Sequence, residues 1–208
     1  MTDQPVERFR ATSGRITGVI AVVLGLGTVV LGLVDREAGF PGWLMAGAFL
    51  GAVLAWAAML RPRVWLTEQD LVLRNMFHTV AIPLAAIQEI AVRQVLAVRA
   101  GDRRYVSPAV GRTWRASLRA NRTRSGPSAT GLRDTAESSL ADPAAAAYPD
   151  FVEERIGQRA DDACAQRGIR RYSAEQVALG SGIRREPAWV ELVVLAAASL
   201  TFVVTLVA

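Results

Sequence analysis

The stretches that decide the fold are RPRVWLTEQDLVLRN (61–75), TVAIPLAAIQEIAV (79–92) and QVLAVRAGDRRYV (94–106). Each is a short run of β-branched and aliphatic residues that ends in turn-forming residues. Turns recur about every 8–12 residues, a spacing typical of an antiparallel barrel or sandwich rather than of βαβ units. The sequence therefore predicts a small antiparallel β-domain in the middle of the chain.

Strongly apolar segments flank this domain, at 16–34 and 43–60 before it and at 188–208 after it. A helix needs about 20 apolar residues to cross the hydrocarbon core of a bilayer, so each segment is predicted to be a transmembrane helix. The connection DREAGFPG (35–42) contains glycine and proline and suits a tight helical hairpin. Glu191 lies in the first turn of the last segment, where the membrane interface can hydrate it.

A signal peptide is the alternative interpretation of the first apolar segment. Arginines precede it, as in a signal peptide, but its core exceeds the usual length of about 7–15 residues, and no small-residue cleavage motif follows. A retained helix is therefore the favoured interpretation.

The arginines predict the orientation of the chain. All 24 basic residues are arginine, and the net charge is +5. Arg8, Arg10 and Arg15 precede the first helix, Arg36 lies in the hairpin connection, and the others lie between 61 and 185. Because basic residues stay on the cytoplasmic side, we expect a multi-pass plasma-membrane protein with a cytoplasmic N-terminus and β-domain and an external C-terminus.

The chain after the β-domain changes in composition. Residues 112–147 are rich in Arg, Ser, Thr, Ala and Gly, and are predicted to be a flexible insertion. Asp150 and Glu153 then fit a helix-start box, and apolar residues at helical spacing continue until Gly168. The predicted amphipathic helix suits the open end of the β-domain. The expected domains are an N-terminal tail (1–15), a membrane hairpin (16–60), the β-domain with its helix (61–168), a linker (169–187) and a third membrane helix (188–208).

An antiparallel β-domain closed by one C-terminal helix is the layout of a pleckstrin-homology (PH) barrel. RPRVWLTEQDLVLRN (61–75), IPLAAI (82–87) and GDRRYV (101–106) resemble a family of bacterial PH domains in small actinobacterial membrane proteins, the low molecular weight antigen 6 type. Members show a strand–turn–strand ending in Arg-Asn, a V-P-W-x-x-I step and a hairpin; here Leu84 replaces the usual Trp. The resemblance implies a PH-like barrel that binds or scaffolds without catalysis.

Few residues offer catalytic or metal chemistry. Cys164 and His78 are the only cysteine and histidine, which excludes most nucleophile–base pairs and zinc sites. His78 is interpreted as a turn residue and Cys164 as a small buried hydrophobe on the helix stripe. The close carboxylate pairs are expected to be solvated, in a turn or on the exposed face of a helix: Glu68/Asp70, Glu153/Glu154 and Asp161/Asp162. We expect no enzyme activity, no metal and no cofactor.

A basic segment is the candidate site for anionic lipid headgroups. It consists of Arg112, Trp114, Arg115, Arg119, Arg122 and Arg124. Arginines beside a membrane attract anionic lipids, although a solvated basic loop on the cytoplasmic side has the same composition. The acidic turn TEQD (67–70) stands where phosphoinositide-binding PH domains carry a basic loop, which argues against inositol phosphates. Nucleic acid is not an expected partner, because no recognition motif is present.

The leading hypothesis is a non-catalytic, membrane-anchored PH-like protein that binds a membrane or cytoplasmic protein, or scaffolds a complex, at the cytoplasmic face. The alternative is an anionic-lipid surface sensor that acts through the basic segment 112–124. A small transporter or membrane enzyme is disfavoured, because the membrane segments carry no charged residue near mid-bilayer.

Overall fold

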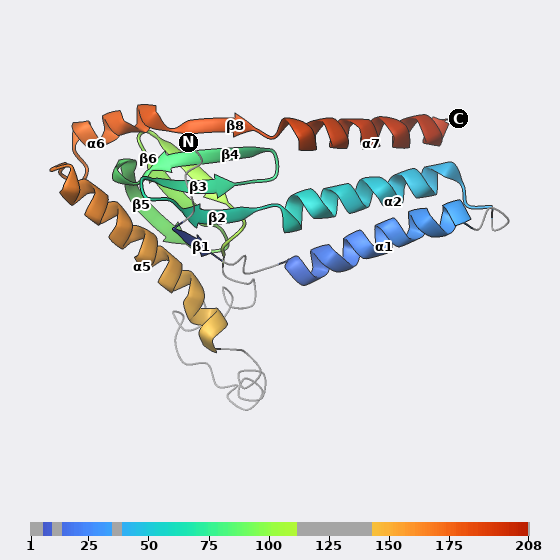
Figure 1. Cartoon of the computed structure of the whole chain (residues 1–208), viewed down its shortest axis with the longest axis horizontal. Helices are drawn as coiled ribbons and strands as arrows, with labels where there is room; N and C mark the ends of the chain where they lie inside the picture. Colours follow the sequence, from blue (N-terminus) through green and yellow to red (C-terminus); the bar gives the residue numbers. More distant parts are fainter. Residues whose placement is uncertain (1–5, 10–13, 35–38, 112–142, 208) are drawn as a thin grey trace, which may run out of the picture. The chain divides into compact units, whose positions relative to one another are not determined.

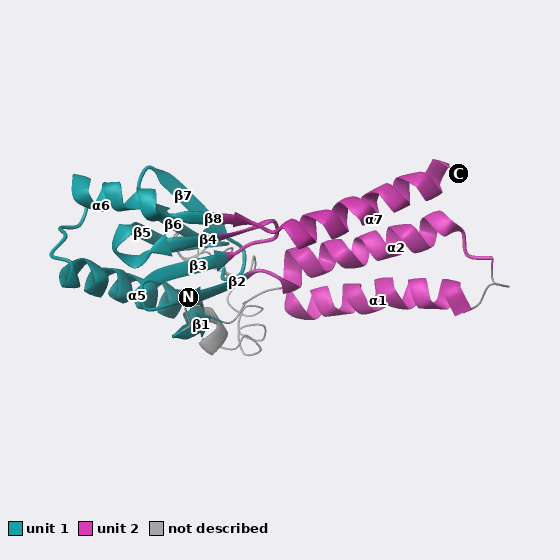
Figure 2. Ribbon diagram, turned by 45° about the horizontal axis from the view of Figure 1, so that its top comes forward, with its two compact units in different colours: residues 1–13, 63–73, 80–184 teal, residues 14–62, 74–79, 185–208 magenta. Residues whose placement is uncertain are grey.

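The structure is a computed structural model that describes residues 6–9, 14–34, 39–111 and 143–207. The chain divides into two compact units, coloured separately in Figure 2. Unit 1 comprises residues 1–13, 63–73 and 80–184, and unit 2 comprises residues 14–62, 74–79 and 185–208.

The β-strands form two antiparallel sheets (Figure 1). The first has the order β1-β2-β3-β4-β8, with strands Glu7–Phe9, Arg63–Leu66, Asp70–Arg74, His78–Pro83 and Arg184–Pro187. The second has the order β5-β6-β7, with strands Ile87–Val92, Leu96–Ala100 and Arg103–Ser107. The strands predicted between 61 and 106 are therefore confirmed.

The two sheets do not close into a single barrel in the described part of the chain. The chain leaves β4 through a 3-10 turn, η2 (Leu84–Ala86), whose residues are all buried. The turn redirects the chain, so β5 pairs with β6 instead of continuing the ladder of β4. Of the barrel or sandwich that the sequence predicts, the described residues thus form two antiparallel sheets that share one apolar core.

Both edge strands of the larger sheet lie outside the predicted β-domain. β1 pairs with β2 in the register Glu7↔Leu66 and Phe9↔Val64, and Phe9 is buried in the core. β8 pairs with β4 and exposes all four of its residues. Residues expected to be a tail and a linker are therefore partly strands. β1 has only three residues, and β8 has polar residues without alternation, so neither gives a period-two signal.

One long helix, α5 (Pro143–Gln166), packs on β5 and η2. Val152, Ile156 and Ala160 on its apolar stripe are fully buried, as the helical spacing predicts. Cys164 on the same stripe is also buried, and burial raises the pKa of its thiol. The helix begins at Pro143 rather than Asp150, because a run of alanines favours helix and Pro149 is accommodated inside it. Residues 143–147, predicted to be flexible, therefore belong to the helix, and the rest of the predicted insertion lies outside the described residues.

A short helix, α6 (Ala174–Ala178), is also part of unit 1 rather than a linker. Ser173 caps it by accepting a hydrogen bond from the Gln176 amide. The fully buried Gln176 side chain donates to the carbonyls of Ala85 (3.1 Å) and Ile87 (3.0 Å). Gln176 thereby gives a buried hydrogen-bond donor to one carbonyl of the η2 turn and to one at the start of β5.

Unit 2 contains three helices that are long and apolar enough to span a membrane. They are α1 (Arg15–Val34), α2 (Gly42–Ala55), which continues as a π-helical turn η1 (Trp56–Leu60), and α7 (Trp189–Val207). α1 packs against α2, and α2 packs against α7 (Figure 1). The length and apolar character predicted for these segments are confirmed.

Candidate functional site

The basic segment singled out in the sequence lies outside the described residues. Arg112, Trp114, Arg115, Arg119, Arg122 and Arg124 all fall between 112 and 142. Lipid contact by this segment therefore stays a prediction. The described residues contain two other places where charged side chains gather, one in each unit.

The first is a hollow on the outer face of the β5–β6–β7 sheet. Inward residues of β6 such as Leu96 and Val98 belong to the core, so the alternate residues Ala97 and Arg99 face outward. The register places Glu89 and Arg104 on either side of Arg99. The hollow measures about 390 Å³ and is lined by Glu89, Ile90, Ala91, Ala97, Arg99, Asp102, Arg103 and Arg104.

The hollow has a small apolar floor and a charged rim. Ala91 and Ala97 lie opposite each other on neighbouring strands, and their short side chains leave the space open. Arg99 and Glu89 approach to 3.9 Å, but each side chain is more than half exposed, so this ion pair contributes little to stability. The rim therefore keeps its charges available to a ligand.

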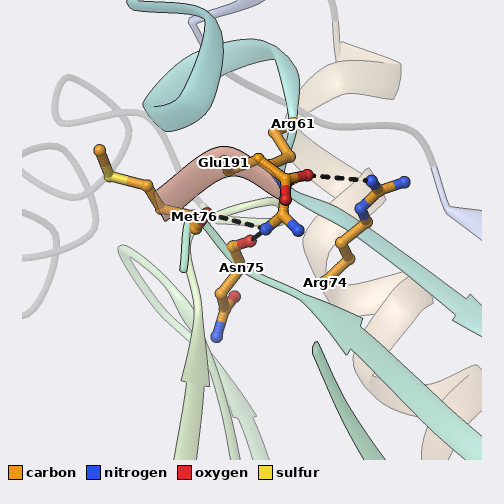
Figure 3. A network of polar contacts seen from close by, with 5 residues as sticks. All are labelled: Arg61, Arg74, Asn75, Met76 and Glu191. Atoms are coloured by element: carbon orange, nitrogen blue, oxygen red, sulfur yellow. Dashed lines mark hydrogen bonds and ion pairs between the residues drawn. The ribbon is translucent and has the colours of Figure 1, made fainter. Parts of the chain in front are cut away.

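The second place is a cluster in unit 2, which we call the arginine clamp: Arg61, Arg74, Asn75, Met76 and Glu191 (Figure 3). Arg61 follows η1 directly, and Glu191 lies in the first turn of α7. The Nε atom of Arg61 donates to Oε1 of Glu191 at 2.6 Å. Nη1 of Arg61 donates to the main-chain carbonyls of Asn75 and, at 2.8 Å, of Met76.

Arg61 is thus engaged through its Nε and Nη1 atoms and is only 6% exposed. Nη2 of Arg74 lies 3.5 Å from the same Oε1 of Glu191, and this side chain is 40% exposed. Glu191 was expected to be hydrated by the interface; instead it is mostly buried and paired with arginine. An arginine directly after one apolar segment and a glutamate at the start of another are the sequence signal for this pairing.

His78 extends the clamp toward β8. Its Nδ1 lies 3.5 Å from Nη2 of Arg185, and its Nε2 lies 3.4 Å from Nδ2 of Asn75. Burial and the neighbouring charges of Arg185 and Arg61 lower the pKa of His78, so its imidazole is neutral at pH 7. A neutral ring nitrogen can accept a hydrogen bond from Arg185. His78 is the first residue of β4, directly after the turn that the sequence predicts.

Asp70 and Glu153 have structural partners, which corrects the expectation that all the close carboxylate pairs are solvated. Asp70 is buried and accepts a hydrogen bond from Arg184 at 2.7 Å. Glu153 accepts from the backbone amide of Val92 at 2.8 Å, because α5 packs against β5. Asp161 forms an exposed ion pair with Arg171. Where residues are described, no three His, Cys, Asp or Glu side chains are grouped so that they could hold a metal ion.

Comparisons with known proteins give no relative from which a role for either site could be inferred. No protein-family model, no curated protein and no solved structure matches the chain.

Proposed function

We propose that the chain is a non-catalytic, membrane-anchored protein whose β-domain binds a protein partner through the outer face of β5–β6–β7. The observation that carries the proposal is the hollow of about 390 Å³, which combines a floor of alanines with a rim of charged side chains. A partner's side chain can fill the floor, while its acidic groups pair with Arg99, Arg103 or Arg104. Glu89 and Asp102 give the rim acceptors as well.

A PH-like fold is part of the proposal. Two antiparallel sheets and one amphipathic helix that packs on β5 and η2 support it, together with the sequence resemblance over 61–106. In this interpretation the domain acts as a rigid platform, and specificity lies in the side chains that the sheet presents.

Anchoring at the cytoplasmic face of the plasma membrane is the second part of the proposal. Its support is the three apolar helices and the arginines that flank them. Because β1 pairs with β2, residues 7–9 and 63–66 would lie on the same side of the membrane. The hairpin of α1 and α2 would then cross the membrane and return to that side.

The proposal is tested with the full chain, purified from native membranes after mild cross-linking. We compare the wild type with Arg99→Glu/Arg104→Glu, which reverses two rim charges, and with Arg167→Glu, which reverses an exposed charge on the turn after α5. We expect one protein to be captured by the wild type and by Arg167→Glu, and at least roughly tenfold less of it by the rim variant, since two charged contacts are lost.

A second arm identifies the contact directly. A photo-reactive amino acid at Ala91, on the floor of the hollow, should cross-link to that same protein. An unchanged capture by the rim variant, together with no cross-link from residue 91, contradicts the proposal. Thermal unfolding of each variant shows that the fold is retained.

A further inference from the structure

The turn between β3 and β4 carries two large apolar residues at its tip. The Asn75 amide donates to the His78 carbonyl at 2.9 Å, which closes a tight hairpin with Met76 and Phe77 as its two central residues. Such turn positions usually hold Gly, Asn, Asp, Ser or Pro, whose backbones or side chains favour the reversal. Met76 and Phe77 offer no such preference, and Phe77 is 42% exposed. The reversal of the chain therefore does not account for these two residues.

Hydrogen bonds to main-chain carbonyls fix this turn to the ends of two apolar helices. The Met76 carbonyl accepts from Nη1 of Arg61 at 2.8 Å, and Arg61 comes directly after η1. The Phe77 carbonyl accepts from the Ala188 amide at 2.9 Å, and Ala188 directly precedes α7. All four residues belong to unit 2, so the turn and these helix ends are parts of the same compact unit.

The same helix ends mark one boundary of the apolar spans. One span ends at Leu60 and another begins at Trp189, which is 69% exposed. Exposed aromatic residues at the end of a spanning helix lie at the level of the lipid headgroups. Met76 and Phe77 are each one hydrogen bond away from a residue at this level. An exposed apolar side chain there gains free energy when it leaves water for the boundary between headgroups and acyl chains.

We propose that the β3–β4 turn is a membrane-surface anchor, in which Met76 and Phe77 insert into the boundary between lipid headgroups and acyl chains. The ligand is the bilayer itself, because both side chains are apolar and carry no group that would recognise a particular headgroup. Met76 is partly exposed, and Figure 3 shows its side chain extending away from Arg61. The inference rests on the membrane anchoring proposed above and is independent of the protein partner at the hollow.

The test measures the depth of single spin labels on the full chain in phosphatidylcholine nanodiscs. The labels are attached to Phe77→Cys, Glu68→Cys and Val193→Cys, each in a Cys164→Ala background. Glu68 is exposed in the turn before β3 and is the matched control for the turn after β3; Val193 is exposed on α7 and reports the anchoring. Collisions with oxygen, which enters lipid, are compared with collisions with a water-soluble nickel chelate. We expect the oxygen-to-nickel collision ratio to be several-fold higher at residues 77 and 193 than at residue 68.

Three results of this experiment would overturn the proposal. A ratio at residue 77 as low as that at residue 68, with a high ratio at residue 193, would show that the helices are anchored but the turn lies in water. Low collision rates of both reagents at residue 77 would show that protein, such as a second copy of the chain, covers the turn instead of lipid. A low ratio at residue 193 would contradict the anchoring itself, and with it the insertion of the turn.

A second measurement keeps the native side chains in place. The wild-type chain is reconstituted with phosphatidylcholine that carries a photo-reactive diazirine on an acyl chain, close to the glycerol. After irradiation, mass spectrometry should find lipid attached to Met76 or Phe77 and none attached to Glu68. Attachment to α7 without attachment to the turn would overturn the proposal. Unfolding temperatures of the spin-labelled variants, compared with that of the Cys164→Ala chain, show that the fold is retained.

Discussion

Arg61 shows how a single side chain can join segments that are distant in the sequence. Its guanidinium contacts the turn after β3 and the first turn of α7, while its backbone continues from η1. A buried charge is tolerated only when its donors are satisfied and an opposite charge is close. Glu191 supplies the opposite charge for Arg61, and two main-chain carbonyls accept hydrogen bonds from its Nη1 atom.

We predict that Arg61→Gln destabilises the protein by about 2–4 kcal/mol, since it leaves Glu191 and two carbonyls poorly satisfied. Thermal unfolding in detergent, followed by circular dichroism, measures the change. Arg63→Gln is the matched control, because Arg63 is exposed two residues away. Equal midpoints for the two variants would show that the clamp contributes nothing to stability.

A second prediction at the residue scale concerns His78 and the pH dependence of stability. Its pKa is lowered in the folded protein from the ordinary value of 6.5, so the unfolded chain binds a proton first as the pH falls. The stability that depends on neutral His78 is therefore fully present above pH 6.5 and is lost as the pH falls through the folded pKa. Unfolding midpoints measured from about pH 7.5 down to about pH 5 should fall more steeply for the wild type than for His78→Gln. Parallel curves would contradict this.

At the scale of the elements, glycines set the spacing of the apolar helices. A Cβ atom added to Gly25 of α1 would lie 2.7 Å from the Ala48 carbonyl oxygen and 2.9 Å from the Ala52 Cβ. Gly47 of α2 has the same role toward Phe202 of α7, at 3.0 Å. Close backbone approach of this kind is how helices associate where no hydrophobic effect drives them together.

We predict that Gly25→Leu separates α1 from α2 and lowers stability by about 1–3 kcal/mol, the usual effect of overpacking. Gly27→Leu is the control on the same helix, because no atom lies within 4 Å of the Cβ position at Gly27. Thermal unfolding in detergent should separate the two variants. The tight packing of α1 on α2 is refuted if both unfold at the wild-type temperature.

The sequence predicted those elements whose pattern is local. The strands from Arg63 to Ser107 alternate or cluster apolar residues, and the stripe of α5 repeats at helical spacing. β1, α6 and β8 are short and gain their stability from partners far along the chain, so no local pattern marks them. The sequence left a barrel and a sandwich open, because the split into two sheets depends on the η2 turn.

The candidate sites were less predictable. The hollow requires the register of three strands, which places Glu89, Arg99 and Arg104 in one row. The clamp requires Arg61 to meet a residue 130 positions away. Two single residues could be predicted from local pattern: Cys164 is buried on the helix stripe, and His78 directly follows the predicted turn.

At the scale of the whole molecule, the proposed topology can be tested with single cysteines in a Cys164→Ala background. Val6→Cys and Glu68→Cys should react with an impermeant maleimide only after the membrane is opened. Pro41→Cys and Val207→Cys should react in intact cells, since they lie at the opposite ends of the apolar helices. Different sides for residues 6 and 68 would contradict the pairing of β1 with β2. Reversed labelling of all four would contradict the orientation alone.

The pairing of β1 with β2 also determines when the larger sheet can be completed during synthesis of the chain. The ribosome releases β1 first, but its partner strand follows only after α1 and α2 have been made. β1 can pair with β2 only after the intervening helices have been made and residues 63–66 can reach residues 7–9. Until then β2 presents unpaired backbone groups, which invite pairing with other chains. A fragment that starts at residue 61 would lack β1 and leave that edge of β2 unpaired, so we expect it to aggregate more readily than the full chain.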